Sequence, residues 1–130
     1  QHDGARKIPW YIYHFNDEII SLAGLYSEWK ESTTGDLIST FTVITTDANE
    51  LMSVIHNSKK RMPVILSGSE EKHWLDLSIP AGELNGLLKS CPSDMLKAHT
   101  ISDLVNNRQA DRNTPDVIKE FTRHKPGGLF

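Results

Sequence analysis

The chain has 130 residues, of which 38% are hydrophobic and 24% charged, a balance that fits one globular domain and excludes an intrinsically disordered chain. The 14 Lys and Arg residues and 17 Asp and Glu residues give a net charge of −3, which excludes a protein that coats nucleic acid through a general basic excess. Any nucleic-acid site must therefore be local.

The first predicted strand, 9–15, is dense in aromatic and β-branched residues and ends at the turn pair Asn16-Asp17. Because the apolar segment 18–29 follows directly, the pattern predicts a β-hairpin between the two segments.

A second turn is predicted in the polar stretch around Gly35, and a strand over 37–46 follows it. Phe41, Val43 and Ile44 indicate that this strand is almost fully buried. We therefore expect three antiparallel strands in this part of the chain.

A short helix is predicted over 51–56, because Leu51 and Ile55 are spaced to lie on one helix face. Asp47 and Glu50 resemble a capping box at its start. Residues 62–66 then predict a short buried strand.

Ser67 and Glu70 form a second capping-box pattern, which predicts a helix through Leu75, and Pro80 is expected to open another helix through Leu88. The remaining sequence predicts a strand over 95–102, a loop over 104–113, a helix that begins at Pro115 and a frayed tail over 123–130. The chain therefore fits an α+β fold, mainly antiparallel β-sheet with short flanking helices.

Metal, cofactor and membrane binding find no support in the sequence. No apolar run approaches the roughly 20 residues that span a bilayer, and the 6 histidines show neither an HxxxH pair nor a Cys partner at ligand spacing. The single cysteine, Cys91, favours an inert thiol in a reducing compartment. We expect a monomer in the cytoplasm, associated with the nucleoid if the protein is bacterial.

The tryptophans offer possible base-stacking surfaces, but their apolar or amphipathic contexts favour positions in the core or at its edge. They are Trp10, Trp29 and Trp74.

His56 is the candidate catalytic residue, because it lies at the predicted end of a helix and directly before a basic loop. An imidazole accepts and returns protons near neutral pH, and neighbouring cations favour its neutral, base-competent form. The alternative is that His56 only caps the helix C-terminus, where the helix dipole favours a cation. From the residues alone, this alternative is the commoner case.

Lys59, Lys60 and Arg61 are consecutive positive charges that could anchor phosphate, although a solvated surface loop has the same pattern. Thr45 and Thr46 are expected where a strand meets a helix. Their hydroxyls and the N–H groups beyond them could hold a phosphate, and N-capping explains them as well.

The segments ITTDAN, LMSVIHN and RMPVIL occur in the order and spacing typical of the SRAP (SOS-response-associated peptidase) family, which the chain resembles. The resemblance runs from KIPWYIYHF through SLAGLYSEW and HWLD to VNNRQADRN and PDVIKEF. It is strongest to the Bacteroidetes-type branch, in which extra residues, here 58–60, separate the histidine from RMP. Residues 1–130 thus resemble the C-terminal portion of a single SRAP domain whose N-terminal part is missing.

The resemblance implies a damage-response protein that senses abasic sites in single-stranded DNA and crosslinks to them. In the family, an N-terminal cysteine captures the abasic-site aldehyde as a thiazolidine, while an asparagine, a glutamate and a histidine position the sugar and move protons. His56 matches that histidine, Thr45 and Arg61 match positions near the DNA backbone, and Lys59 and Lys60 belong to the extra residues.

The cysteine, asparagine and glutamate are expected upstream of Gln1. Glu28 in GLYSEW imitates the family's GxxEW motif, but the order of segments makes Glu28 structural or exposed. The family also implies lyase activity and self-processing peptidase activity, so we expect the full-length protein to be an enzyme and this chain alone to be inactive.

Two alternatives remain open. The first is a non-catalytic single-stranded DNA-binding or interaction module. The second is an unrelated α+β hydrolase that uses His56 with Cys91, which is disfavoured because nothing in the sequence places these residues together.

Overall fold

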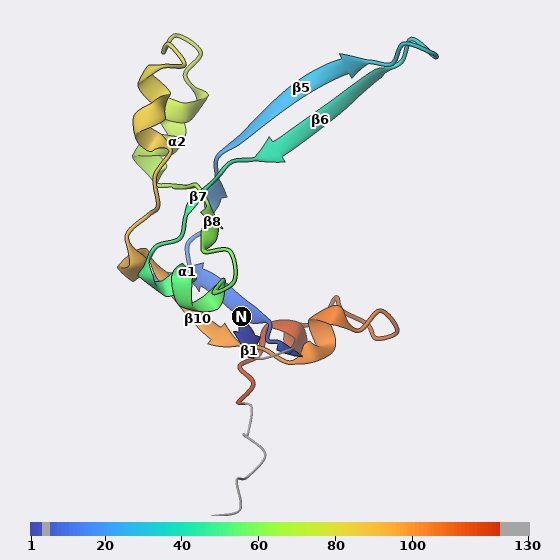
Figure 1. The fold of residues 1–130 in the computed structure, drawn as a ribbon, viewed down its shortest axis with the longest axis vertical. Coiled ribbons are helices and arrows are strands. Elements are labelled where there is room, and N and C mark those ends of the chain that lie inside the picture. The colour runs from blue at the N-terminus through green and yellow to red at the C-terminus, as the bar shows by residue number, and fades with distance from the viewer. Residues whose placement is uncertain (4–5, 123–130) are drawn as a thin grey trace, which may run out of the picture.

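The computed structural model describes residues 1–3 and 6–122 (Figure 1). The strands are β1 His2–Asp3, β2 Arg6–Lys7, β3 Trp10–His14, β4 Ser21–Leu22, β5 Gly24–Lys30, β6 Leu37–Val43, β7 Thr45–Asp47, β8 Arg61–Pro63, β9 Ile65–Leu66 and β10 Leu96–Thr100. The α-helices are α1 Glu50–Ile55 and α2 Gly68–Leu75, and the 3-10 helices are η1 Glu83–Leu87, η2 Ser93–Met95, η3 Asp103–Asn106 and η4 Pro115–Ile118.

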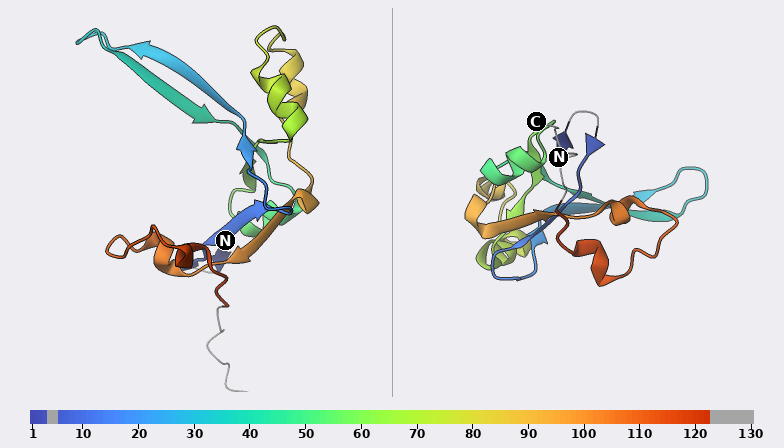
Figure 2. Two further views of the ribbon diagram at one scale, coloured as in Figure 1. Left: turned by 180° about the vertical axis from the view of Figure 1, so that it is seen from behind. Right: turned by 90° about the horizontal axis from the view of Figure 1, so that it is seen from below.

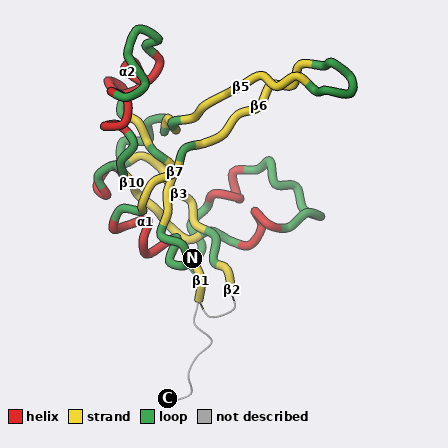
Figure 3. Tube along the Cα trace, turned by 45° about the horizontal axis from the view of Figure 1, so that its top comes forward, coloured by secondary structure: helices red, strands yellow, loops and turns green. Residues whose placement is uncertain are grey.

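The strand pairs are β1–β2, β3–β10, β4–β9, β5–β6 and β7–β8, and each is antiparallel. Short helices flank them, as the colouring of Figure 3 shows. The predicted α+β class with mainly antiparallel sheet is therefore confirmed. The tail predicted to fray lies outside the described residues.

The hairpin predicted between 9–15 and 18–29 is wrong. The turn forms as expected, with the Asp17 N–H donating to the His14 carbonyl at 2.9 Å. However, β3 pairs along its whole length with β10, from Trp10 opposite Thr100 to His14 opposite Leu96. The Asn16-Asp17 pair predicts only the local turn, whereas the strand that pairs with β3 comes much later in the sequence.

Three chain segments meet at a hub formed by Ala23, Ile44 and Val64. Ala23 N–H donates to the Val64 carbonyl, Val64 N–H to the Ile44 carbonyl and Ile44 N–H to the Ala23 carbonyl, each at 2.9 Å. At the hub, the segment 21–30 changes its partner from β9 to β6, and the segment 37–47 changes its partner from β5 to β8.

Gly24 follows the hub and has no room for a side chain. A Cβ on this residue would lie 2.9 Å from the Thr42 carbonyl oxygen, so glycine permits the close approach of β5 and β6.

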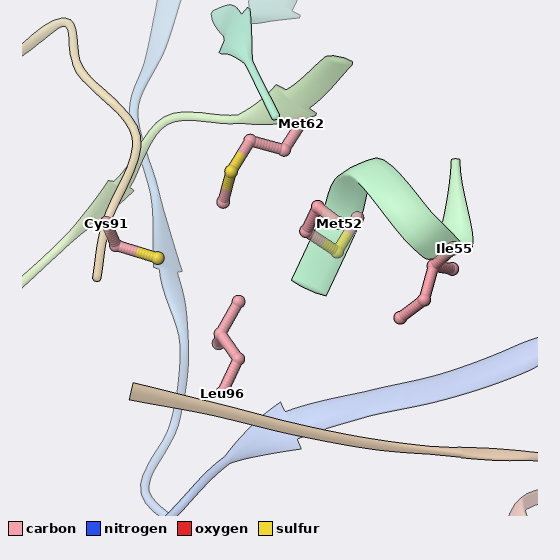
Figure 4. Close-up of a cluster of buried hydrophobic side chains, with 5 residues drawn as sticks. All are labelled: Met52, Ile55, Met62, Cys91 and Leu96. Carbon is pink, nitrogen blue, oxygen red and sulfur yellow. The ribbon is translucent and has the colours of Figure 1, made fainter. Parts of the chain in front are cut away.

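The main core lies below the hub, between α1, β8 and β10. Its buried side chains are Met52, Ile55, Met62, Cys91 and Leu96, which converge on one space in Figure 4. A second cluster at the hub consists of Ala23, Val64 and Leu66, with half-buried Trp74 packed against it. Met62, Val64 and Leu66 are all buried, which confirms the predicted burial of 62–66. The segment forms two strands in place of one, because β8 pairs with β7 and β9 pairs with β4 on either side of Val64.

The expected burial of the strand 37–46 is wrong. Every residue of β6 is exposed, and the exposed fraction of Phe41 is 84%. Of the three apolar residues that predicted burial, Phe41, Val43 and Ile44, only Ile44 at the hub is half-buried. The β5–β6 hairpin extends away from the rest of the molecule in Figures 1 and 2, so its side chains lack neighbouring elements to pack against.

Helix starts follow local capping chemistry, with one correction. α1 is capped by Asn49, whose Oδ1 accepts the Met52 N–H at 2.9 Å, because Asp47 belongs to β7 and lies opposite Arg61. α2 carries the predicted capping box of Ser67 and Glu70. The hydrogen bonds from Ser67 lower the pKa of the Glu70 carboxyl.

Two predicted helices form only as 3-10 turns. The segment 80–88 contains η1, and Gly82 and Gly86 explain why an α-helix does not continue there. The helix predicted to begin at Pro115 is the short η4, while η3 occupies the start of the predicted loop 104–113.

Candidate functional site

The turn from α1 into β8, residues 56–60, is closed by backbone hydrogen bonds. His56 is the C-cap of α1 and donates its N–H to the Met52 carbonyl at 2.7 Å. Lys60 N–H donates to the His56 carbonyl at 2.8 Å, and Ala48 N–H donates to the Lys60 carbonyl at 3.0 Å. Lys60 adopts a positive φ of 48°, which lets the chain reverse within this turn.

The His56 ring is oriented by the backbone of Arg61. Nδ1 of His56 lies 2.7 Å from the Arg61 carbonyl oxygen and 3.4 Å from the Arg61 nitrogen. A carbonyl oxygen only accepts, so the shorter contact requires a hydrogen on Nδ1, and that nitrogen then cannot accept from the Arg61 N–H. In the neutral ring, Nε2 therefore carries the lone pair and is the basic atom.

The Arg61 side chain is held by Thr45. Nε of Arg61 donates to Thr45 Oγ1 at 3.1 Å, and Nη2 donates to the Thr45 carbonyl oxygen at 3.1 Å. The pairing of β7 with β8 produces this contact, since it sets Asp47 opposite Arg61 and places Thr45 diagonally across from it. Within the described residues, Nη1 of Arg61 has no protein acceptor.

Thr45 and Thr46 do not cap α1. Thr45 serves as an acceptor for Arg61, and Thr46 Oγ1 donates to the Leu88 carbonyl at 3.5 Å. The structure thus brings His56, Arg61 and Thr45 together. Lys59 and Lys60 stand exposed beside them, with no ion pair to any residue in the described part of the chain.

Asn57 joins this turn to the first strand and was missed by sequence reasoning. The His2 N–H donates to Asn57 Oδ1 at 2.9 Å, and Asn57 Nδ2 donates to the His2 carbonyl oxygen at 2.9 Å. The first residues therefore lie beside the His56 turn (Figure 1). A contact between residues so distant in the chain leaves no local pattern that could have revealed it.

We predict that Asn57→Ala will raise the solvent-exchange rate of the His2 amide about 30-fold, because both hydrogen bonds with the side chain are lost and together they contribute about 2 kcal/mol. Amide exchange by NMR measures this rate. Asn16→Ala, at an exposed turn, is the control and should leave the His2 rate unchanged. An unchanged rate in Asn57→Ala would show that the β1–β2 pairing holds His2 without Asn57.

A family model described as SOS response associated peptidase (SRAP) matches residues 1–108. The chain belongs to the SRAP family. The resemblance drawn from ITTDAN, LMSVIHN and RMPVIL is thereby confirmed.

The most informative relatives are longer proteins. The SRAP chain is 37% identical over 118 residues to abasic site processing protein YoqW of Bacillus subtilis, a match that covers 90% of this chain and 50% of that protein. It is 31% identical over 138 residues to abasic site processing protein HMCES of Gallus gallus, a match that covers 91% of this chain and 39% of that protein. A crystal structure of a Bacteroides thetaiotaomicron protein matches with a TM-score of 0.84 and 38% identity. The match covers 94% of this chain and 52% of the solved chain. The SRAP chain spans about half the length of the relatives it matches, or less.

Cys91 does not form a dyad with His56 in the SRAP chain. The cysteine is buried in the main core and accepts a hydrogen bond from Asn49 Nδ2 at 3.8 Å. Burial raises the pKa of its thiol, so the thiolate is disfavoured. His56 is instead hydrogen-bonded to Arg61, which leaves the hydrolase alternative without a nucleophile–base pair.

The tryptophans divide between the core and the projecting hairpin. Trp10 and Trp74 are half-buried and pack against the two core clusters, as predicted. Trp29 is exposed, contrary to the prediction, because within residues 1–3 and 6–122 the sheet of β5 contains no strand besides β6.

Among the described residues, no group of three or more His, Cys, Asp or Glu side chains is arranged to hold a metal ion. In the same part of the chain, no helix is long and apolar enough to cross a membrane.

Proposed function

We propose that this SRAP chain supplies the proton-transfer and phosphate-binding residues of an enzyme that processes abasic sites in single-stranded DNA. The carrying observation is that the Arg61 backbone orients the His56 ring while Thr45 holds the Arg61 side chain. A base and a cation are thus fixed at one end of β8. The names of the relatives, abasic site processing proteins, support the substrate class.

The proposed role of His56 follows from its tautomer. Opening the ring of an abasic sugar removes a proton from the anomeric hydroxyl and adds one to the ring oxygen, which exposes the aldehyde. A neutral imidazole with its lone pair on Nε2 can take the first proton and return one to the ring oxygen. The aldehyde then condenses with the amine of an N-terminal cysteine, releasing water, and the thiol closes a thiazolidine.

The same proton transfer serves the lyase and self-processing activities that we include in the proposal, since each needs a general acid–base group near the reacting bond. The cysteine in this proposal is not Cys91, which is buried.

Arg61, Thr45, Lys59 and Lys60 are proposed to hold the DNA backbone. Two guanidinium nitrogens of Arg61 contact Thr45, which fixes the plane of the group and leaves Nη1 without an acceptor among the described residues. Such a preoriented guanidinium suits a phosphate oxygen better than a mobile side chain. Lys59 and Lys60 are exposed on the adjacent turn and would add charge without a fixed geometry.

We expect Arg61→Ala to weaken binding to single-stranded DNA by a similar factor for every sequence, because a phosphate contact carries no base information. The slope of log affinity against log salt should fall by about 0.7 for one lost phosphate contact. Fluorescence anisotropy at several salt concentrations measures both quantities. The matched control is Lys72→Ala, an exposed cation on α2 that should change neither. Equal affinities and slopes in Arg61→Ala and wild type would place DNA elsewhere.

The non-catalytic alternative also has an observation in its favour. The described residues include the basic turn but no exposed cysteine, since Cys91 is buried. They could bind DNA without any covalent step. The effect of substituting His56, argued in the Discussion, separates this alternative from the enzyme.

A further inference from the structure

We propose that Asn57 is a positioning residue for His56, because its side chain holds the 56–60 turn against β1. This inference rests on the proposed function, since it concerns the reaction that His56 serves. The Asn57–His2 contact consists of two hydrogen bonds of 2.9 Å, in which the His2 N–H donates to Asn57 Oδ1 and Asn57 Nδ2 donates to the His2 carbonyl oxygen.

The Asn57–His2 contact requires an amide side chain. An amide has one atom that accepts and one that donates, and the backbone of His2 offers the complementary N–H and carbonyl. These partners also fix which amide atom is the oxygen, since only the oxygen can accept from an N–H. Aspartate at neutral pH could accept but not donate, and alanine could do neither. Either substitution therefore disrupts the contact.

The 56–60 turn is held at its ends by backbone hydrogen bonds. At one end the His56 N–H donates to the Met52 carbonyl, and at the other the Ala48 N–H donates to the Lys60 carbonyl. Asn57 fastens the residues between these ends to β1, which lies beside the turn in Figure 1. Because Asn57 follows His56 directly, the two residues share one planar peptide unit. A contact that fixes Asn57 therefore also restrains the backbone from which the imidazole extends.

The reactive form of the His56 ring depends on a short contact. Nδ1 of His56 lies 2.7 Å from the Arg61 carbonyl oxygen, which keeps a hydrogen on Nδ1 and the lone pair on Nε2. A rotation of the His56 backbone would lengthen this contact, and the neutral ring would then exchange between its two tautomers. Only one tautomer leaves Nε2 able to take a proton from the sugar. Loss of the Asn57–His2 contact thus lowers the fraction of the ring in the reactive form.

Asn57 acts through His56 and not on the DNA. Both polar atoms of its side chain are bonded to the backbone of His2. Its loss therefore changes the reaction by displacing His56, while the phosphate contacts proposed for Arg61 and Thr45 stay in place. This separation gives the proposal a kinetic signature.

The test compares Asn57→Ala with the wild type in a complete SRAP protein that contains this chain. At saturating abasic single-stranded DNA, the rate constant of covalent capture should fall by about 10 to 10²-fold, because displacing a catalytic group by about 1 Å can cost 10²-fold. The DNA concentration that gives half the maximal rate should not change. In nitrogen NMR spectra of the neutral His56 ring, the Nδ1 and Nε2 signals should move toward each other as the tautomers mix.

Ser58→Ala is the matched control, because Ser58 lies in the same turn and is exposed. Its capture rate and its His56 signals should equal those of the wild type. The double variant that combines His56→Gln with Asn57→Ala should be no slower than His56→Gln alone, since no imidazole is left to position. Circular dichroism verifies that Asn57→Ala remains folded, which we expect because Asn57 is exposed and lies outside the core clusters.

Any of four results would overturn the positioning role. They are a wild-type capture rate in Asn57→Ala, unchanged His56 nitrogen signals, a higher half-saturating DNA concentration at an unchanged maximal rate, and rate losses that multiply in the double variant. A slow His56→Gln beside a normal Asn57→Ala rejects the positioning role and leaves the proposed function standing. A wild-type rate in His56→Gln overturns the proposed function and this role with it.

Discussion

His56→Gln in a complete SRAP protein that contains this chain should slow covalent capture of abasic single-stranded DNA by about 10² to 10⁴-fold, the usual effect of losing a general acid–base group. Glutamine retains hydrogen-bonding groups near the Arg61 carbonyl, which His56 Nδ1 contacts at 2.7 Å, but it cannot transfer a proton near neutral pH. Single-turnover crosslinking kinetics measure the rate, and DNA affinity should change much less.

His73→Gln is the matched control, because His73 is an exposed histidine in the last turn of α2. Its capture rate should equal that of the wild type. If His56→Gln also captured DNA at the wild-type rate, His56 would be a helix cap only, and the non-catalytic alternative would gain support.

Met62→Ala should lower the free energy of unfolding by about 2–5 kcal/mol, the range for truncating a large buried side chain. Met62 is 1% exposed, and its Sδ also accepts the Asn49 N–H at 3.3 Å at the start of α1. The substitution would therefore leave a cavity between α1 and β10 and loosen the start of α1. Urea denaturation followed by circular dichroism measures the change.

Val54→Ala provides the comparison, because Val54 is on the same small helix but is 57% exposed. Its effect should stay within about 0.5 kcal/mol, as for surface substitutions in general. Similar losses for the two variants would show that Met62 contributes no more packing than a surface residue.

Features encoded within a few residues were predictable from the sequence. The Ser67 and Glu70 capping box, the buried strand 62–66 and the helix that ends at His56 all depend on local hydrogen bonds or on apolar spacing. The same locality explains why His56 and Arg61 could be chosen as candidates, since they lie on two sides of one turn.

Features that depend on distant segments were not predictable. The partner of β3 is β10, and the backbone of His2 is hydrogen-bonded to the side chain of Asn57. Neither contact changes the local pattern of either segment. The predicted burial of β6 was wrong for a related reason. Apolar residues in a strand favour burial, but they do not show which other segment packs against that strand.

An NMR titration of the isotope-labelled chain with a short single-stranded oligonucleotide that carries a stable abasic-site analogue tests the central claim most directly. We predict that the largest chemical-shift changes will fall on Thr45 and on residues 56–61, with the His56 ring signals included, because these residues form the proposed phosphate and proton-transfer site. Shift changes concentrated on the segment 104–113 or on β3 and β10, with Thr45 and Arg61 unaffected, would contradict the account.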